Sequence, residues 1–185
     1  VVQLSELPAG PGPDMEWLRT ARPSVERLAA QRLPSAELRR AIVAWTGITG
    51  SDGPFVLGRH GSELDLWRTP ALSSGHTFLV IVEQDAPIDE WRMMRNGTSH
   101  RDGAGHPMIC GRIGDFPAPS MRPAINNSVR EAVERRRITA HRVIGPGPNG
   151  NFAYDVCRFP IVDSAGNVAR LLTKSHVHIR LAGPE

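Results

Sequence analysis

Two histidines near the end of the chain have the spacing of metal ligands. His176 and His178 lie two residues apart on a predicted strand, so both side chains point to the same side, where two imidazoles can share a metal ion. His141 on the preceding hairpin can join them, but the next carboxylate is the terminal Glu185 and the charge of Lys174 on the same side opposes a cation. We therefore predict an exposed sheet face or a helix contact here. A metal-dependent enzyme that uses His176 and His178 is the alternative.

A second group of reactive side chains lies in one polar, glycine-rich loop over residues 96–107. Ser99, His100 and Asp102 in proximity suggest hydrolysis. Nucleophilic catalysis needs these groups to be held in order by rigid elements beside an oxyanion donor, which a polar loop of this kind rarely supplies. The segment Gly103–Gly105 is too short for a phosphate-binding fingerprint. No catalytic residue is therefore assigned.

Charge and composition argue against a nucleic-acid partner. The 185 residues carry a net charge of +3, and aromatic residues make up 5 % of the chain, which leaves few rings to stack on bases. Arg39, Arg40 and the triplet 135–137 keep a DNA-contacting regulator as a second alternative. The triplet ends a predicted helix, however, where cations interact favourably with unpaired carbonyl groups. We expect no nucleic acid to bind.

Cysteine content and hydropathy point to an ordinary intracellular protein. The two cysteines, Cys110 and Cys157, are too few for a disulfide framework and form no CxxC metal signature, so both are expected to be buried as small apolar side chains. No apolar run is long enough to span a bilayer, and no secretory signal opens the chain. We therefore expect a soluble, cytoplasmic protein with no membrane partner.

The stretch 120–179 predicts one amphipathic helix followed by three antiparallel strands. Ser120 is the expected N-cap and Pro123 lies in the first turn. Apolar residues then recur at steps of three and four on one side of the helix, at Ala124, Ile125, Val129, Ala132 and Val133. The predicted strands cover 138–144, 152–162 and 168–179, with a long loop over 145–151 and a tight turn over 163–167.

Alternation predicts which side of these strands is buried. In 168–179 the small and apolar residues share one side, which we expect to face the core, and the charged residues share the other. In 152–162 the apolar residues change side near Val156. Either a bulge or apolar cover on both faces explains this change.

The first half of the chain predicts short helices and then a hairpin. Helices are expected to begin at Asp14, Ser24 and Ser35, and a breaker-rich junction follows them. Strands are predicted at 55–57 and 64–67, then a central strand over 77–83 that returns over 90–95, and a short strand or helical turn at 108–110. We divide the chain into a helical and irregular extension over 1–75 and a second domain over 76–185.

The order of these elements resembles a PAS domain. The resemblance covers roughly residues 77–179 and is most specific over 121–179, where a helix is followed by RRRITAHRV, NFAYDVCRFPIVDSAGNV and LLTKSHVHI. The chain also looks like bacterial stand-alone PAS-like proteins with a helical N-terminal region. The resemblance implies an α+β fold with an antiparallel sheet of about five strands, helices on one face and an N-terminal helical extension. It further implies non-catalytic sensing or binding of a small molecule in signal transduction.

The cofactors of that family are not supported here. Flavin-binding light sensors carry an Asn-Cys-Arg-Phe-Leu-type motif on a helix, whereas VCRF at 156–159 is on a predicted strand. Haem-binding members use a histidine on the helix before the last three strands, and residues 121–137 contain none. The sequence therefore supports neither haem nor flavin, and the cofactor is left unknown.

A small-molecule pocket is predicted between this helix and the core face of the sheet. Apolar walls with a few hydroxyl groups are typical of such pockets, although a solid core with backbone-bonded hydroxyls fits equally. The N-terminal helices are apolar enough to pack on a second copy, so a homodimer is expected. The predicted pocket is lined by Met93, Ile125, Val129, Cys157, Phe159, Thr173 and Ser175.

Overall fold

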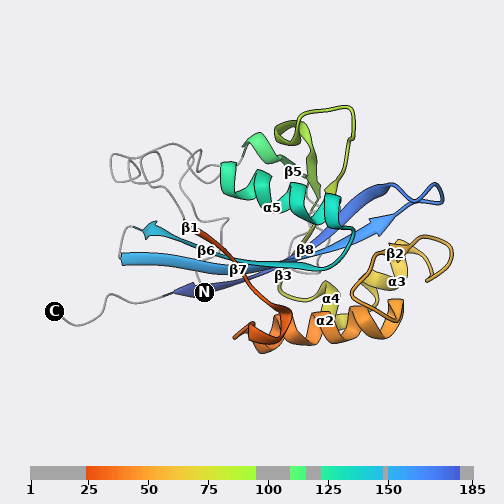
Figure 1. Cartoon of the computed structure of the whole chain (residues 1–185), viewed down its shortest axis with the longest axis horizontal. Helices are drawn as coiled ribbons and strands as arrows, with labels where there is room; N and C mark the ends of the chain where they lie inside the picture. Colours follow the sequence, from red (N-terminus) through yellow and green to blue (C-terminus); the bar gives the residue numbers. More distant parts are fainter. Residues whose placement is uncertain (1–23, 95–108, 116–121, 148–149, 180–185) are drawn as a thin grey trace, which may run out of the picture.

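A computed structural model describes residues 24–94, 109–115, 122–147 and 150–179. Its centre is one eight-stranded sheet with the hydrogen-bonded order β1-β6-β7-β8-β3-β4-β5 (Figure 1). Neighbours along this path are antiparallel, and β2 pairs with β7 in parallel. The strands are β1 (Ser24–Arg27), β2 (Phe55–Val56), β3 (His76–Ile81), β4 (Arg92–Met94), β5 (Ile109–Arg112), β6 (Thr139–Gly147), β7 (Gly150–Val162) and β8 (Val168–Ile179).

The long strands β6, β7 and β8 form the meander that the sequence predicts. The turn between β7 and β8 is fixed by the Asp163 carboxylate, whose Oδ1 accepts hydrogen bonds of 2.9 Å from the backbone N–H groups of Ala165 and Asn167. Gly166 takes a φ of 83°, which only glycine adopts without cost. The turn therefore sets the register in which β8 returns along β7.

Helix α2 (Ala36–Thr49) covers one face of the sheet. Ser35 is its N-cap, accepting a hydrogen bond from the Leu38 N–H at 3.3 Å, and Gly50 ends it at a φ of 75°. The ring of Trp45 lies 5.1 Å from that of Phe159 on β7. The short helices α3 (Glu63–Trp67) and α4 (Pro70–Ser73) lie on the same side of the sheet as α2 (Figure 1).

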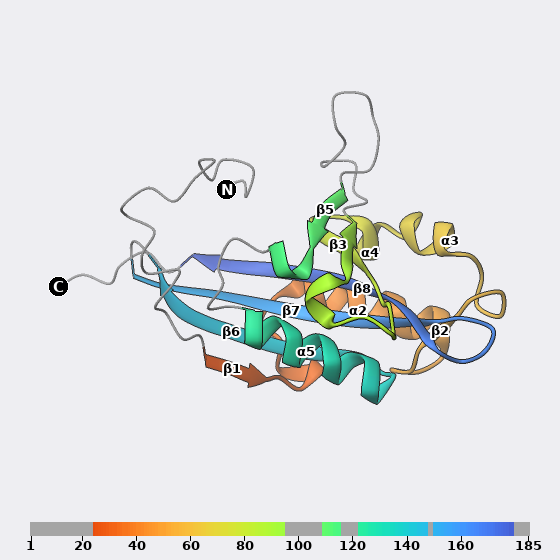
Figure 2. The ribbon, with the colours of Figure 1, turned by 90° about the horizontal axis from the view of Figure 1, so that it is seen from above.

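Helix α5 (Arg122–Arg135) covers the opposite face and contacts β6, β7 and β8. Its buried residues are Ala124, Ser128, Val129 and Ala132, which confirms the amphipathic side predicted from sequence. The 3-10 turns Ile88–Glu90 and Ile113–Asp115 contact each other, and the first also contacts α5. Figure 2 shows α5 and the β5 segment over this same face.

The fold is α+β, as predicted, but the layers differ from the prediction. The described sheet has eight strands rather than about five, and helices cover both faces rather than one. The reason is that residues of the predicted extension join the sheet, since β1 pairs with β6 and β2 with β7. Among the described residues, no helix combines the length and apolarity that a membrane crossing requires.

Several local predictions were wrong for identifiable reasons. The helix expected from Ser24 is instead strand β1, whose backbone pairs with the outer edge of β6 from Ile144 to His141. The strand expected at 64–67 is helix α3, which begins where the Asp65 carboxylate accepts a 2.7 Å hydrogen bond from the Ser62 N–H. Three predictions lie outside the described residues: the helix from Asp14, the N-cap at Ser120 and the loop over 96–107.

The long strands depart from prediction in the loop that joins two of them, and they decide two alternatives that the sequence left open. The expected loop 145–151 is shorter, because β6 and β7 remain paired as far as Gly147 and Gly150. Of the two arrangements predicted for the charged side of β8, an exposed face or a helix contact, the structure shows the helix contact: α2 lies over Leu172 and Lys174, which are at most 1 % exposed. The change of side in β7 involves no bulge near Val156, where the pairing is continuous; apolar cover on both faces explains it.

Candidate ligand-binding site

The strands β6–β8 present two buried faces, named here after the helix that covers each. The α5 face carries Thr139 and His141 on β6, Val156 and Arg158 on β7, and Leu171 and Thr173 on β8. The α2 face carries Ala140 and Arg142 on β6, Asp155, Cys157 and Phe159 on β7, and Leu172 and Lys174 on β8.

The predicted pocket residues divide between these faces. Val129 belongs to the apolar cluster under α5, and Ile125 and Met93 pack against that cluster. Thr173 lies on the α5 face, and alternation along β8 places Ser175 on the same side. The structure places Cys157 and Phe159 in the other cluster, beneath α2. Five of the seven predicted residues therefore share a side, and these two do not.

A row of polar side chains crosses the α5 face. Arg158 on β7 pairs with Thr139 on β6 and with Thr173 on β8, so the three are direct cross-strand neighbours. Their exposed fractions are 3 %, 1 % and 0 %. Within the described part of the chain, Nε and Nη1 of Arg158 and the hydroxyls of both threonines are buried without a hydrogen-bond partner. Such a concentration of unsatisfied polar atoms is rare in a folded protein.

Arg158 keeps its charge in this environment. Burial lowers the pKa of its guanidinium to about 10, against the opposing influence of Tyr154, Cys157 and Glu131. A group with that pKa is protonated at neutral pH. The α5 face therefore contains a buried cation with free N–H donors.

Glu131, the carboxylate that raises the pKa of Arg158, already has three other partners. Glu131 on α5 forms ion pairs with Arg27 at 3.1 Å and with Arg135 at 2.6 Å, and its Oε2 lies 2.8 Å from His141 Nε2. Burial raises the pKa of the Glu131 carboxyl, but these three partners together lower it below its ordinary value. Glu131 is therefore ionised and pairs with Arg27, Arg135 and His141.

His141 completes the polar row on β6. Burial lowers the pKa of this imidazole, with Arg158 and Arg27 acting in the same direction against Glu131. The carboxylate of Glu131 can only accept, so Nε2 of neutral His141 carries the hydrogen and Nδ1 is an acceptor. That Nδ1 is buried and has no partner among the described residues.

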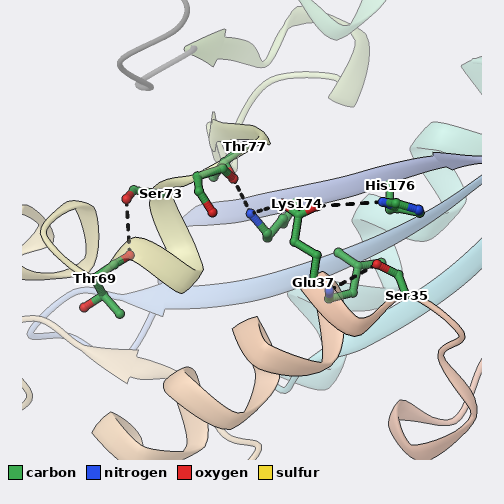
Figure 3. A network of polar contacts seen from close by, with 9 residues as sticks. Ser35, Glu37, Thr69, Ser73, Thr77, Lys174 and His176 are labelled. Carbon is green, nitrogen blue, oxygen red and sulfur yellow. Dashed lines mark hydrogen bonds and ion pairs between the residues drawn. The ribbon is translucent and has the colours of Figure 1, made fainter. Parts of the chain in front are cut away.

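The α2 face also contains a buried cation, but this one is paired. Lys174 is 0 % exposed, and its Nζ lies 2.8 Å from Glu37 Oε1 on α2 and 3.3 Å from the Thr77 hydroxyl (Figure 3). It also donates to the carbonyl of Ser74. Gly75, at a φ of 68°, leaves room for the Glu37 carboxylate, which a side chain at this position would strike.

Other ionisable groups on the α2 face are likewise occupied. Arg142 donates to both carboxylate oxygens of Asp155, at 2.8 and 3.0 Å. His176 Nδ1 lies 3.7 Å from Glu37 Oε2, so a carboxylate of α2 accompanies this histidine of the predicted metal pair (Figure 3). The side chain of His178 lies outside the described residues. Across the described ranges, no three histidine, cysteine or carboxylate side chains are grouped to hold a metal ion.

No protein-family model, curated protein or solved structure matches this chain.

Cys157 is a packing residue rather than a reactive one. It is fully buried in the α2-face cluster, as predicted, and burial raises the pKa of its thiol to about 12. A thiol with this pKa is protonated at neutral pH and is a poor nucleophile. The side chain of Cys110 is outside the described residues.

An open cleft of about 370 Å³ lies at the C-terminal end of α5. Val82, Trp91 and Val168 form its apolar wall, and Glu134 and Arg136 its rim. The indole N–H of Trp91 is already bonded to the carbonyls of Glu83 and Ala86, at 2.7 and 3.0 Å. The cleft therefore offers surface contact but no free buried donor, unlike the row around Arg158.

Sequence reasoning missed Arg158 and Thr139 and considered His141 only as a metal ligand. The signal was the apolar change of side in β7, because a strand that is covered on both faces has no exposed side for an arginine. Arg158, between Cys157 and Phe159, must then be buried whichever face it takes.

Proposed function

We propose that this chain is a PAS-like sensory module that binds a small molecule between α5 and the sheet without catalysing a reaction on it. The arrangement of the described strands supports this proposal. Strand β8 lies between the hairpin β3–β4 and the meander β6–β7, and the helix that precedes the meander crosses these strands. The resemblance to PAS domains rests on the order of these elements along the chain, in which the hairpin is followed by the helix and then by three antiparallel strands.

The observation that carries the proposal is the set of unsatisfied polar atoms under α5. Buried hydroxyl groups in a solid core bond to the backbone or to each other, because an unbonded one costs free energy. The Thr173 and Thr139 hydroxyls, together with Nδ1 of His141, make no such bond within the described residues. A bound ligand with polar groups would satisfy them, which supports a binding site on this face.

Signalling through the other face follows from the same architecture. Helix α2 packs on the opposite side of β7 and β8 and leaves Val43 69 % exposed to solvent. A change in the α5 face of β8 reaches α2 through Lys174 and Glu37, which are joined at 2.8 Å. We propose that α2 also supplies the contact of a homodimer, which light scattering at micromolar concentration tests directly.

Native mass spectrometry of freshly purified protein tests the proposed function. We expect a mass above that of the polypeptide, which is released as a small molecule on denaturation. A Thr173→Val variant should lose occupancy, because valine has the shape of threonine without its hydroxyl. Thr77→Val is the matched control on the α2 face and should keep full occupancy. Bare polypeptide in the wild type, with no stabilisation by any compound of a metabolite library, would overturn the proposal.

A further inference from the structure

Arg158 differs from an ordinary interior arginine in what surrounds it. It lies on β7, with β6 hydrogen-bonded on one side and β8 on the other, and only 3 % of its surface is exposed. Two of its three guanidinium nitrogens have no hydrogen-bond partner among the described residues. A buried charge in proteins is normally paired and fully bonded, since removing it from water is costly.

The described carboxylates near β7 already form ion pairs or hydrogen bonds with other side chains. Glu131 is bonded to Arg27, Arg135 and His141. Asp155 projects to the α2 face, where Arg142 binds both of its oxygens. Glu131 acts on Arg158 electrostatically, but Nε and Nη1 of the guanidinium have no hydrogen-bond partner among the described residues, so these two donors are available to a negative group brought from outside.

The neighbours of Arg158 match the needs of a carboxylate. Thr139 and Thr173 lie directly beside it across the strands, at a Cα separation of roughly 4.5–5.5 Å for such pairs. Their hydroxyls have no hydrogen-bond partner among the described residues, and their strands lie on either side of β7. N–H and O–H donors on neighbouring strands beside one positive charge are groups that can bind the oxygens of an anion.

We propose that Arg158, Thr139 and Thr173 bind the carboxylate group of a small organic monoanion under α5. This inference rests on the proposed function and names its ligand class. A single buried cation balances one negative charge, so a monocarboxylate is favoured over a phosphate dianion, which brings a second charge into the interior. The Nδ1 acceptor of His141, farther along β6, can receive a hydrogen bond from a hydroxyl carried by the same ligand.

Titration with defined anions tests the ligand class. The wild-type protein is titrated with the sodium salts of acetate, pyruvate and lactate, and with sodium chloride at matched ionic strength, by calorimetry and thermal melting. We expect at least one carboxylate to bind saturably and raise Tm, because a ligand that binds only the folded state stabilises it. Phosphate should bind at least tenfold more weakly. Equal effects of chloride, or tighter binding of phosphate, would overturn the inference.

Variants then locate the binding. Arg158→Met should weaken carboxylate binding by a factor of 100 or more, and Thr173→Val by about tenfold, because each removes donors from the site. Arg137→Met, which changes an exposed arginine 3.9 Å from Asp52, is the matched control and should bind as the wild type does. If Arg158→Met does not fold, Thr173→Val decides the question: unchanged carboxylate affinity in that variant contradicts the inference.

The two proposals can fail separately. If native mass spectrometry finds an uncharged ligand whose binding depends on Thr173 but not on Arg158, the sensory function stands and the carboxylate assignment is wrong. If no compound binds and no carboxylate stabilises the protein, both are wrong. Carboxylate binding that Arg158→Met abolishes and Arg137→Met preserves supports both.

Discussion

The two faces of the sheet each bury one cation, and they treat it differently. Beneath α2, Lys174 is held by a carboxylate, a hydroxyl and a backbone carbonyl. Beneath α5, Arg158 has two nitrogens without a partner within the described residues, and the hydroxyls on both sides of it are also unbonded. The α2 face is thus complete by itself, whereas the α5 face has bonding capacity left over.

We propose that this difference separates a structural charge from a charge that serves binding. A buried ion pair fixes the relative position of the elements that carry it, and here Lys174 joins β8 to α2, to β3 and to the segment after α4. An unpaired buried charge contributes nothing of this kind and lowers the stability of the free protein. A chain retains such a charge when another function depends on it, which for Arg158 we propose to be ligand recognition.

Breaking the pair on the α2 face should give the largest change. Glu37→Gln leaves Lys174 fully buried with its charge uncompensated, and such a loss destabilises proteins by about 3–5 kcal/mol. Because Glu37 is 30 % exposed and water can reach it, we expect about 3 kcal/mol, measured by urea unfolding. The double variant Glu37→Gln, Lys174→Met should recover part of this loss. If the single and double variants are equally stable, the pair is not coupled.

Removing the cation on the α5 face should act in the opposite direction. Arg158→Met takes away a buried charge whose Nε and Nη1 have no hydrogen-bond partner among the described residues, while methionine keeps most of the apolar contact area. We expect the ligand-free variant to be about 1–2 kcal/mol more stable than the wild type in urea unfolding. Destabilisation comparable to that of Glu37→Gln would show that Arg158 is a structural residue, and the contrast between the faces would disappear.

Lowering the pH should destabilise the protein through His141, which lies on the α5 face. The pKa of its imidazole is lowered in the folded state, mainly by burial, so the unfolded chain binds a proton that the folded protein does not. Stability is therefore complete above the unfolded pKa of about 6.5 and is lost as pH falls below that value. His141→Gln should flatten this loss in urea unfolding between pH 7 and 5. A His141→Gln variant that keeps the wild-type slope would show that this imidazole does not cause the loss.

The sequence predicts individual helices, strands and turns better than it predicts which strands pair with each other. The turn at 163–167 and the amphipathic side of α5 depend on local residue types, and both were predicted correctly. Strand β1 was missed because its position is set by the free edge of β6, more than a hundred residues away along the chain, and its four residues are all exposed. Local periodicity contains no information about such an edge.

The same limit explains the errors at the candidate site. Thr173, Val129 and Ile125 could be assigned to one side from alternation and helical periodicity alone. Arg158 could not, because its neighbours Cys157 and Phe159 face α2, and its own burial depends on the cover of the opposite, α5 face. An arginine between two apolar residues, in a strand whose apolar residues change side, is nevertheless a signal that can be searched for in other sequences.

The smallest predicted effect compares two threonines, one for each face. The Thr77 hydroxyl donates to the Ser74 carbonyl at 2.9 Å and accepts from Lys174, so Thr77→Val should destabilise the protein by about 1 kcal/mol. The Thr173 hydroxyl is fully buried without a partner among the described residues, and Thr173→Val should leave stability unchanged or raise it by up to about 1 kcal/mol. Both replacements keep the side-chain shape, so the difference in unfolding free energy reports the hydroxyl alone. A Thr173→Val variant that loses as much stability as Thr77→Val would mean that this hydroxyl is bonded within the folded chain, and the spare bonding capacity under α5 would be smaller by one donor.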